Sequence, residues 1–309
     1  MTSWTSADIP DQTGRTVFIT GANSGLGLRS AQALARSGAQ VILGCRNAGK
    51  AADALTEVKG EATGDEPFVV SLDLANLASI SAAAEEVSRR VERIDVLMNN
   101  AGVMAIPRAE TADGFEAQFG TNHLGHFALT GRLLPLLLRS TDPRVVTTSS
   151  QAHRVGRMRF DDPHWRKSYR KWPAYGQSKL SNLLFTLELD RRAKAAGSNL
   201  VAAAAHPGYA ATHLQAVTYE TSGNRLMGQI MNFANQYVAQ SDAAGAWPQL
   251  YAATMPGVHG GQYYGPGGPF EMRGYPELVT PISAARRADD AHKLWDLSER
   301  ETEVTYSWT

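Results

Sequence analysis

The chain has 309 residues, a length that suits one large α/β domain or two smaller ones. With 43% hydrophobic and 19% charged residues it can bury a sizeable core, which excludes a disordered chain. Thirty Lys and Arg balance thirty Asp and Glu, so the net charge gives no reason to expect nucleic acid or an anionic membrane as a partner. The single cysteine, Cys45, excludes an internal disulfide framework and any cysteine-rich metal site.

The N-terminal fifteen residues carry acids and prolines where a secretory signal would need a basic start and an apolar run. The most apolar stretches, such as residues 133–138, are far too short to span a bilayer. We therefore expect a soluble, cytoplasmic protein with no membrane partner.

Short apolar runs alternate with segments of helical periodicity along the chain. The pattern predicts strands at 17–20, 41–44, 68–72, 96–98, 144–148, 200–205 and 262–264, and helices at 26–37, 50–58, 80–91, 117–139, 175–196 and 283–298. Continuous apolar strands separated by helices indicate a parallel sheet covered on both faces. With no repeat or linker, the sequence predicts one doubly wound α/β domain (a Rossmann fold) over residues 1–309, with substrate-side insertions near 152–173 and 212–240.

A glycine-rich turn joins the first predicted strand to the first helix. Glycines let the backbone bend tightly there and let a pyrophosphate approach, while the helix N-terminus attracts the anion. An ordinary glycine-rich turn is the alternative, but the position between strand and helix favours a nucleotide site. The residues expected to hold the phosphates are Gly21, Asn23, Ser24, Gly25, Leu26 and Gly27.

Arg46 follows the second strand, where a site for NAD(H) would place an acid against the ribose 2′-hydroxyl. A guanidinium can instead bind a 2′-phosphate through two charge-assisted hydrogen bonds. The sequence therefore favours NADP(H), with Arg46 as the main contact and Ser24 as a second one. The alternative for Arg46 is a solvated loop arginine.

Tyr175 and Lys179 are four residues apart on a predicted helix, so they share one face. A free phenol has a pKa of about 10, and a nearby lysine cation stabilises the phenolate, which would fit the pair for proton transfer. Ser149 and Ser150 follow the fifth strand, at the same edge of the sheet as the glycine turn. Asn122 lies inside a predicted helix, where asparagine is a mediocre helix former.

The spacing Gly21-x-x-x-Gly25-x-Gly27 together with these four polar groups resembles the short-chain dehydrogenase/reductase family. The resemblance implies that Ser150 hydrogen-bonds the substrate oxygen and that Tyr175 transfers the proton. It implies further that Lys179 holds the nicotinamide ribose and lowers the pKa of Tyr175, and that Asn122 anchors a water that relays protons to Lys179. Ser149 is then structural.

Other matches follow in the family's order between residues 14 and 212. The resemblance assigns Asp73 and Leu74 to the adenine, Asn100, Ala101 and Gly102 to the adenosine ribose, and Pro207, Gly208 and Thr212 to the nicotinamide side. The long charged and aromatic segment between Ser150 and Tyr175 looks most like the retinol-dehydrogenase-like branch. The substrate class is not carried over from that likeness.

The expected function is hydride transfer between the nicotinamide of NADP(H) and a small carbonyl or alcohol substrate. A non-catalytic NADP(H) sensor and a cofactor-assisted epimerase are the alternatives. The complete set of four polar groups argues against a sensor, and the glycine spacing argues against an epimerase. The helices at 117–139 and 175–196 are those that this family commonly pairs, so a homodimer or homotetramer is open.

Several side chains that could suggest a metal site or a reactive group are expected to be structural. His123, His126 and His153 do not have a metal-ligand spacing, and we expect no metal. Cys45 is expected to be a small buried filler. The aromatic residues of the insert could either line the substrate site or pack the insert onto the domain; they are Trp165, Tyr169 and Trp172.

Overall fold

The computed structural model describes residues 3–208 and 241–308; Thr212 and the predicted insertion at 212–240 lie outside these residues. Eight strands form one sheet in the order β3-β2-β1-β4-β5-β6-β7-β8. The strands are β1 (Thr16–Thr20), β2 (Gln40–Cys45), β3 (Phe68–Ser71), β4 (Val96–Asn99), β5 (Arg144–Thr148), β6 (Val201–Ala205), β7 (Tyr263–Pro266) and β8 (Pro276–Leu278).

Strands β1 to β7 are parallel, which confirms the predicted doubly wound sheet. The strand order reverses beside β1, where β2 pairs on one side and β4 on the other, and ligands of such sheets bind outside the carboxyl ends of the strands at this point. The short edge strand β8 was not predicted, and it pairs antiparallel with β7.

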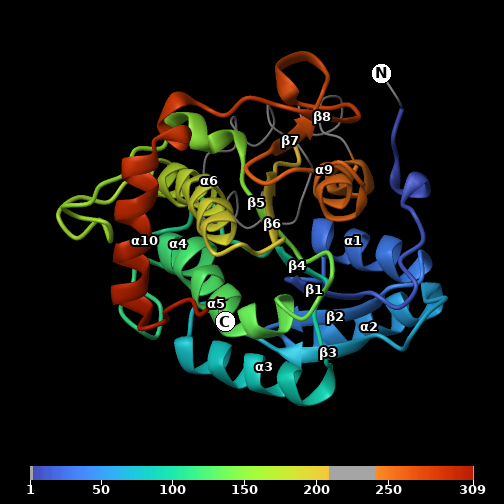
Figure 1. Ribbon diagram of the computed structural model, residues 1–309. Coiled ribbons are helices and arrows are strands. Elements are labelled where there is room, and N and C mark those ends of the chain that lie inside the picture. The colour runs from blue at the N-terminus through green and yellow to red at the C-terminus, as the bar shows by residue number, and fades with distance from the viewer. Residues whose placement is uncertain (1–2, 209–240, 309) are drawn as a thin grey trace, which may run out of the picture.

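Helices cover both faces of the sheet (Figure 1). They are α1 (Gly25–Arg36), α2 (Ala48–Glu61), α3 (Leu77–Arg90), α4 (Ala117–Phe119), α5 (Gly125–Leu137), α6 (Lys171–Ala195), α9 (Asp242–Thr254) and α10 (Ala288–Thr302), with the short helices η1 (Ser6–Asp8), η2 (Gly120–Leu124), η3 (Gln151–Val155), η4 (Pro269–Glu271) and η5 (Ser283–Arg286). Alternate residues of β1 supply the two cores: Val17 and Ile19 pack with α1, α2 and α9, whereas Phe18 packs with α3 and α5.

The predicted helix at 117–139 is not regular. Between α4 and α5 the turn η2 is a π-helix, in which the Gly125 amide donates to the Gly120 carbonyl five residues earlier. An extra residue in one turn leaves no trace in the hydrophobic period, so the pattern could not reveal it, and such turns often lie at functional sites. Asn122 lies in the middle of this turn.

Other boundaries also differ from the predictions. The helix that carries Tyr175 begins four residues earlier, at Lys171. The predicted helix at 283–298 is divided into η5 and α10 by the extended residue Arg287. The buried helix α9 was missed, because Gly245 and Pro248 are poor helix formers and its small, mostly buried residues give no clear polar face.

The C-terminal helix α10 packs against α6 and α5. Trp295 of α10 is 2% exposed, and its ring centre lies 5.0 Å from that of Phe127 and 6.0 Å from that of Phe185. Within the described residues, no helix combines the length and apolarity needed to cross a bilayer.

Candidate active site

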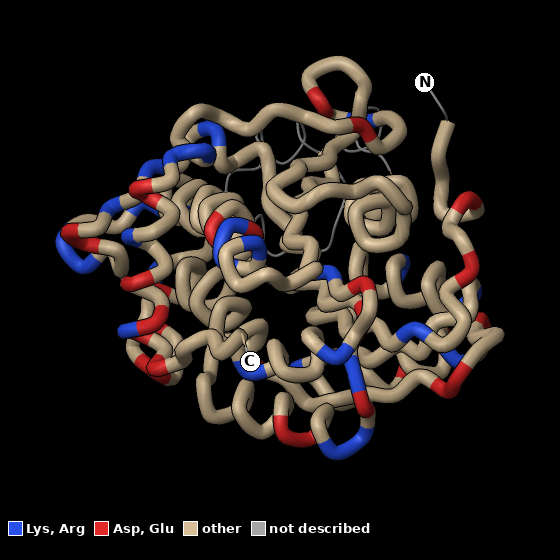
Figure 2. The backbone as a smooth tube through the Cα atoms, viewed as in Figure 1, with Lys and Arg blue, Asp and Glu red and all other residues tan. Residues whose placement is uncertain are grey.

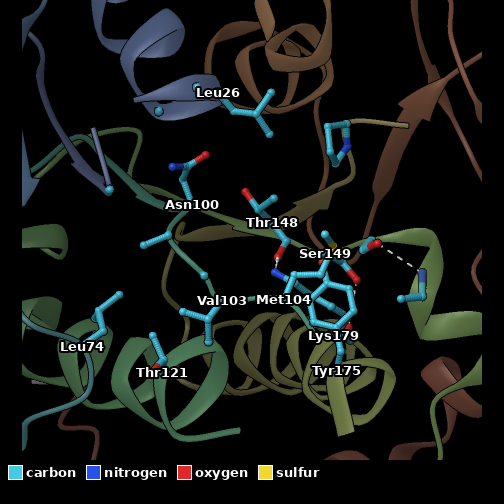
Figure 3. A pocket seen from close by; sticks show the side chains of 18 of the residues that line it. Leu26, Leu74, Asn100, Val103, Met104, Thr121, Thr148, Ser149, Tyr175 and Lys179 are labelled. Atoms are coloured by element: carbon cyan, nitrogen blue, oxygen red, sulfur yellow. Dashed lines mark hydrogen bonds between the residues drawn. The ribbon is translucent and has the colours of Figure 1, made fainter. Parts of the chain in front are cut away.

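A cavity of about 730 Å³ lies at the carboxyl edge of the parallel strands (Figure 3). The predicted site residues that line it are Gly21, Asn23, Ser24, Gly25, Leu26, Gly27, Arg46, Asp73, Leu74, Asn100, Ala101, Gly102, Ser150, Tyr175, Lys179, Pro207 and Gly208. Of the other two, Asn122 lies behind the wall and is fully buried, and Thr212 is outside the described residues. The fold thus brings segments that are far apart in the sequence to one elongated cavity.

The glycine turn is shaped for a close approach of backbone to ligand. Gly21 has φ +67°, the left-handed region that favours glycine. A Cβ on Gly27 would overlap the Gly21 carbonyl oxygen and lie 2.7 Å from Asn100 Nδ2. Ser24 is the N-cap of α1, but its side chain makes no capping hydrogen bond. The first turn of α1 therefore faces the cavity with its N-terminal amides uncapped by that side chain, an arrangement that fits a phosphate.

Thr20 ties this turn to the end of β4. Its Oγ1 accepts hydrogen bonds from the backbone amides of Asn100 and Ala101, both at 2.9 Å. Asn100 Nδ2 in turn donates to the Thr20 carbonyl at 2.8 Å. These bonds hold the floor of the cavity at the point where the strand order reverses.

One end of the cavity, which we name the Arg46 end, is open to solvent. The Arg46 side chain is 71% exposed, and its Nη1 lies 3.9 Å from Asp73 Oδ1. A guanidinium in such a position is free to turn toward an anionic ligand, and the weak solvated contact with Asp73 costs little to break.

The opposite end, the Tyr175 end, is buried. Tyr175 is 7% and Lys179 4% exposed, and both belong to the first turns of α6. Lys179 Nζ lies 5.8 Å from the centre of the Tyr175 ring and donates to the Thr148 carbonyl at 3.0 Å. Figure 3 shows both side chains reaching from α6 toward the end of β5. Thr148 was not predicted, because a backbone carbonyl leaves no signal in the sequence.

Burial shifts the pKa values of both titrating groups at the Tyr175 end. It raises the pKa of Tyr175 to about 12, although a hydrogen bond with Ser150 works in the opposite direction. It lowers the pKa of Lys179 to about 8. Both groups lose water that would stabilise their charged forms, so the phenol is held neutral and the ammonium is close to titrating at neutral pH.

The two serines after β5 have different surroundings. Ser149 is 2% exposed and donates to the Lys179 backbone carbonyl at 2.8 Å, which positions α6 against β5. Ser150 is the N-cap of η3 and accepts a hydrogen bond from the Ala152 amide at 3.2 Å. Only Ser150 shares a hydrogen bond with the Tyr175 hydroxyl.

Asn122 fastens the loop that follows β4 to α6. Its Oδ1 accepts from the Val103 amide at 2.8 Å, and its Nδ2 donates to the Val103 carbonyl and to Ser178 Oγ, both at 2.9 Å. All side-chain polar groups of Asn122 are thus engaged, and its backbone carbonyl remains for other partners.

That carbonyl is the acceptor of His126, a residue whose role was not predicted. His126 Nδ1 lies 3.0 Å from the Asn122 carbonyl oxygen, and Nε2 lies 2.9 Å from Thr20 Oγ1. A carbonyl only accepts, so the proton is on Nδ1 and the Thr20 hydroxyl donates to Nε2. Burial lowers the pKa of His126 to about 4, which keeps the ring neutral. The i, i+4 spacing of Asn122 and His126 was the available signal.

The other tempting residues have structural partners. His123 Nε2 bonds to Ser298 Oγ at 2.8 Å, and His153 Nδ1 donates to the Ser150 carbonyl at 2.7 Å. Within the described part of the chain, no group of three or more His, Cys, Asp or Glu is arranged to hold a metal ion. Cys45 is 3% exposed, and burial raises the pKa of its thiol to about 11, which confirms it as a buried filler.

The aromatic residues of the insert divide between the two predicted roles. Trp165 is 6% exposed beneath Arg159, and the Tyr169 hydroxyl accepts from Gln118 Nε2 at 2.8 Å, so both pack the insert. Trp172 is 47% exposed and lines the cavity beside Tyr175. The apolar lining residues that were not predicted include Val155, Phe270 and Met272.

The known proteins that this chain resembles are dehydrogenases. The model of the short chain dehydrogenase family matches residues 15–223. The chain is 39% identical to human retinol dehydrogenase 14 (Homo sapiens) over 93% of this chain and 85% of that protein, and 36% identical to mouse polyprenol dehydrogenase (Mus musculus) over 93% and 83%.

Two solved structures are also similar to this chain. A crystal structure of an uncharacterized protein from Mycobacterium paratuberculosis is 44% identical, with a TM-score of 0.80 over 99% of this chain and all of that one. A short chain dehydrogenase from Shigella flexneri complexed with NADP is 25% identical, with a TM-score of 0.64 over 82% of this chain and 96% of that one. The chain belongs to the short-chain dehydrogenase/reductase family, in its retinol-dehydrogenase-like branch.

Proposed function

We propose that this oxidoreductase transfers a hydride between NADP(H) and a carbonyl or alcohol substrate, with Tyr175 as the general acid and base. The observation that carries the proposal is the Tyr175 end of the cavity, where a neutral phenol, a serine hydroxyl and a buried ammonium converge. The family assignment supports redox chemistry there.

In the reducing direction, NADPH held along this cavity would supply a hydride for the carbonyl carbon of the substrate. Negative charge then develops on the substrate oxygen, and Tyr175 donates its phenolic proton to that oxygen. Ser150 donates a hydrogen bond to the same oxygen, and the Lys179 charge stabilises the resulting phenolate. Asn122 holds the loop beside Lys179, and the resemblance assigns to it the water through which Lys179 would return a proton to Tyr175.

The cofactor preference rests on the Arg46 end. The solvent-exposed Arg46 suits a ribose 2′-phosphate, and Ser24, whose side chain makes no capping bond, is a second donor near the same turn. Similar structures complexed with NADP and NADPH support this choice. The uncapped start of α1 fits the pyrophosphate, and Asp73, Leu74, Asn100 and Pro207 would line the rest of the cofactor.

The test is NADPH oxidation against a panel of aldehydes, ketones and quinones. Tyr175→Phe should lower kcat about 10³-fold, while NADPH binding followed by fluorescence stays within a few-fold of wild type. Tyr251→Phe is the matched control, because Tyr251 packs against Trp4 and Tyr264 and does not line the cavity. It should keep full activity.

Tight NADPH binding without turnover of any panel member would instead favour a sensor. Equal turnover by wild type and Tyr175→Phe would remove Tyr175 from the mechanism.

A further inference from the structure

The loop between β7 and β8, residues 267–275, reaches the cavity. Phe270 of this β7–β8 loop lines the cavity, and so does Gln151, the residue that follows Ser150. Gln151 Nε2 donates to the carbonyl oxygens of Phe270 and Glu271, at 2.6 and 3.0 Å. The β7–β8 loop is therefore tied to the segment that begins at Ser150.

The same loop contacts the turn that follows β6. Gly208 of that turn has φ +65°, and a Cβ on it would lie 2.5 Å from the Met272 carbonyl oxygen and 2.9 Å from that of Glu271. Gly208, its neighbour Pro207 and Met272 all line the cavity. The family resemblance assigns this turn to the nicotinamide side. A substrate held between the nicotinamide and the proposed catalytic serine would therefore have the β7–β8 loop beside it.

Two residues of the loop have an unfavourable backbone conformation. Phe270 and Glu271 have φ of 56° and 55°, in the left-handed region that residues other than glycine seldom adopt. The Phe270 side chain is 87% exposed, so its own packing does not offset this cost. Such a conformation persists only where the surrounding structure holds it, so other contacts of the loop must do so.

The Glu271 carboxylate makes such contacts. Glu271 is one of the charged residues of both signs that Figure 2 shows on the chain between β7 and β8. Its Oε1 accepts from Arg154 Nη2 at 2.8 Å, and its Oε2 lies 3.1 Å from His206 Nε2. The Gly208 amide donates to His206 Nδ1 at 3.1 Å, so a neutral ring carries its proton on Nε2, facing the carboxylate. His206 and Arg154 hold the pKa of Glu271 below its ordinary value, so the carboxylate is ionised at neutral pH.

His206 gives this contact a fixed position. Its side chain is buried, and a Cβ on Gly265 of β7 would overlap its Nε2, so the ring lies directly against that strand. The ring centre of His206 is 5.2 Å from that of Tyr263, which lies 5.6 Å from that of His153. His153 Nδ1 in turn donates to the Ser150 carbonyl at 2.7 Å. Packed rings therefore connect the carboxylate to the backbone of the proposed catalytic serine.

We propose that Glu271 is a positioning residue, which holds the β7–β8 loop at the Tyr175 end and thereby sets which substrates the site accepts. The inference rests on the proposed function, because it concerns the substrate of that reaction. Glu271 does not itself line the cavity, whereas its neighbours Phe270 and Met272 do. Loss of the carboxylate contacts would let both of these side chains move away from a bound substrate.

An ordinary surface ion pair is the alternative. The Arg154 side chain is 40% exposed, and a pair between exposed groups contributes little on its own. Glu271 differs from such a group, because its side chain is 22% exposed and its second oxygen faces the fully buried side chain of His206. Removing the carboxylate would leave that buried donor without its partner, which costs more than the loss of a solvated pair.

Hydrogen exchange of the loop amides tests the contact without any substrate. Glu271→Gln keeps the size of the side chain and removes its charge, so it should accelerate exchange in residues 267–275 about tenfold through local opening. Arg154→Met removes the partner charge and should act in the same direction. Glu61→Gln is the matched control, since Glu61 pairs with Arg36 at 2.9 Å and does not line the cavity. It should leave exchange of the loop unchanged.

Substrate selection is measured as NADPH oxidation with aldehydes graded in size from propanal to 3-phenylpropanal. Glu271→Gln should raise KM for 3-phenylpropanal about tenfold, and should change KM for propanal, kcat and NADPH affinity by less than about twofold. Met272→Ala shortens a lining side chain directly. It should shift the ratio of the two KM values in the same direction without accelerating exchange of the loop.

Unchanged exchange in both Glu271→Gln and Arg154→Met would overturn the proposal, whatever the activity of the enzyme. Faster exchange with an unchanged KM ratio would also overturn it, because Glu271 would then be purely structural. An equal effect of Glu61→Gln would have the same meaning. If the wild type turned over no aldehyde of the series, the proposed function would be contradicted for aldehydes, and exchange alone would decide whether Glu271 holds the loop.

Discussion

The Arg46 end and the Tyr175 end of the cavity hold their cations in opposite environments. The Arg46 side chain is 71% exposed, whereas Lys179 is 4% exposed. Water screens the first cation, which leaves it fit to recognise a charge on a ligand at little cost to the fold. Burial lowers the pKa of the second to about 8, which places a proton where it can move at neutral pH. In the proposed function, the exposed cation would therefore recognise the cofactor, and the buried cation would take part in the proton transfer.

Lys179→Met should have the largest effect, because it removes the buried cation and keeps the length of the side chain. We expect kcat to fall about 10³-fold. We also expect the free energy of unfolding at pH 7 to rise by about 1–3 kcal/mol, because the folded protein no longer holds a buried charge. Asn182 Nδ2 also donates to the Thr148 carbonyl, at 3.0 Å, so that acceptor stays paired.

The direction of this stability change follows from the lowered pKa of Lys179. Burial lowers it from 10.5 to about 8, so below pH 8 the folded state pays the full cost of the buried charge, and that cost fades between pH 8 and 10.5. Arg46→Met is the control and should leave the free energy of unfolding nearly unchanged. Urea denaturation of both variants checks the pair, and a less stable Lys179→Met would contradict the account.

Arg46→Asp tests the open end. Loss of a charge-assisted pair and gain of repulsion should lower kcat/KM for NADPH roughly 10- to 100-fold and move the preference toward NADH. Initial rates with both cofactors measure the ratio. Arg89→Asp, an equal charge change on α3, should leave the ratio alone. An unchanged ratio in Arg46→Asp would make Arg46 a solvated loop arginine and nothing more.

The pH dependence of carbonyl reduction should show which buried group sets the alkaline limit. In the proposed mechanism, reduction needs a protonated Tyr175 and a charged Lys179. Tyr175, with its pKa raised to about 12, stays protonated well above neutral pH. Lys179 loses its charge first, so the rate should fall about tenfold per pH unit above pH 8. Lys179→Arg keeps its charge in this range and should abolish the fall, whatever its absolute rate.

We expect His126→Phe to have the smallest effect of these variants. It tests the contribution to stability of the two hydrogen bonds that His126 makes, with Thr20 and with the Asn122 carbonyl. The substitution leaves the Thr20 hydroxyl and the Asn122 carbonyl each without the His126 partner, and should lower the free energy of unfolding by about 1–3 kcal/mol. The melting temperature should fall by several degrees. His126→Gln, which can both donate and accept, should recover part of the loss, and equal losses in both variants would exclude the hydrogen bonds as the cause.

The sequence was informative wherever chemistry needs a particular side chain or a period. The strands of the parallel sheet, the glycine turn and the Tyr175–Lys179 spacing could all be predicted, because apolar runs and i, i+4 pairs indicate local geometry directly. The π turn at Asn122 and the Thr148 carbonyl could not be predicted, because they depend on backbone groups. The i, i+4 spacing of Asn122 and His126 placed these residues near each other, but it did not show that His126 contacts the Asn122 carbonyl and Thr20.

The net charge describes the whole chain and no single surface. Equal numbers of acids and bases led us to expect no nucleic acid or anionic membrane as a partner, and that expectation stays a prediction, while residues 151–172 contain seven Lys or Arg and two Asp. Position along the fold, and not the sum, decides what a surface can bind.

The C-terminal helix has a consequence for self-association. Because α10 already covers α6 and part of α5, two copies of this chain could meet on that side only through the outer surface of α10. That surface presents His292, Lys293, Asp296 and Arg300 to solvent. Charged side chains are depleted from the centres of stable subunit interfaces, so we expect the outer surface of α10 to disfavour pairing of two copies on that side.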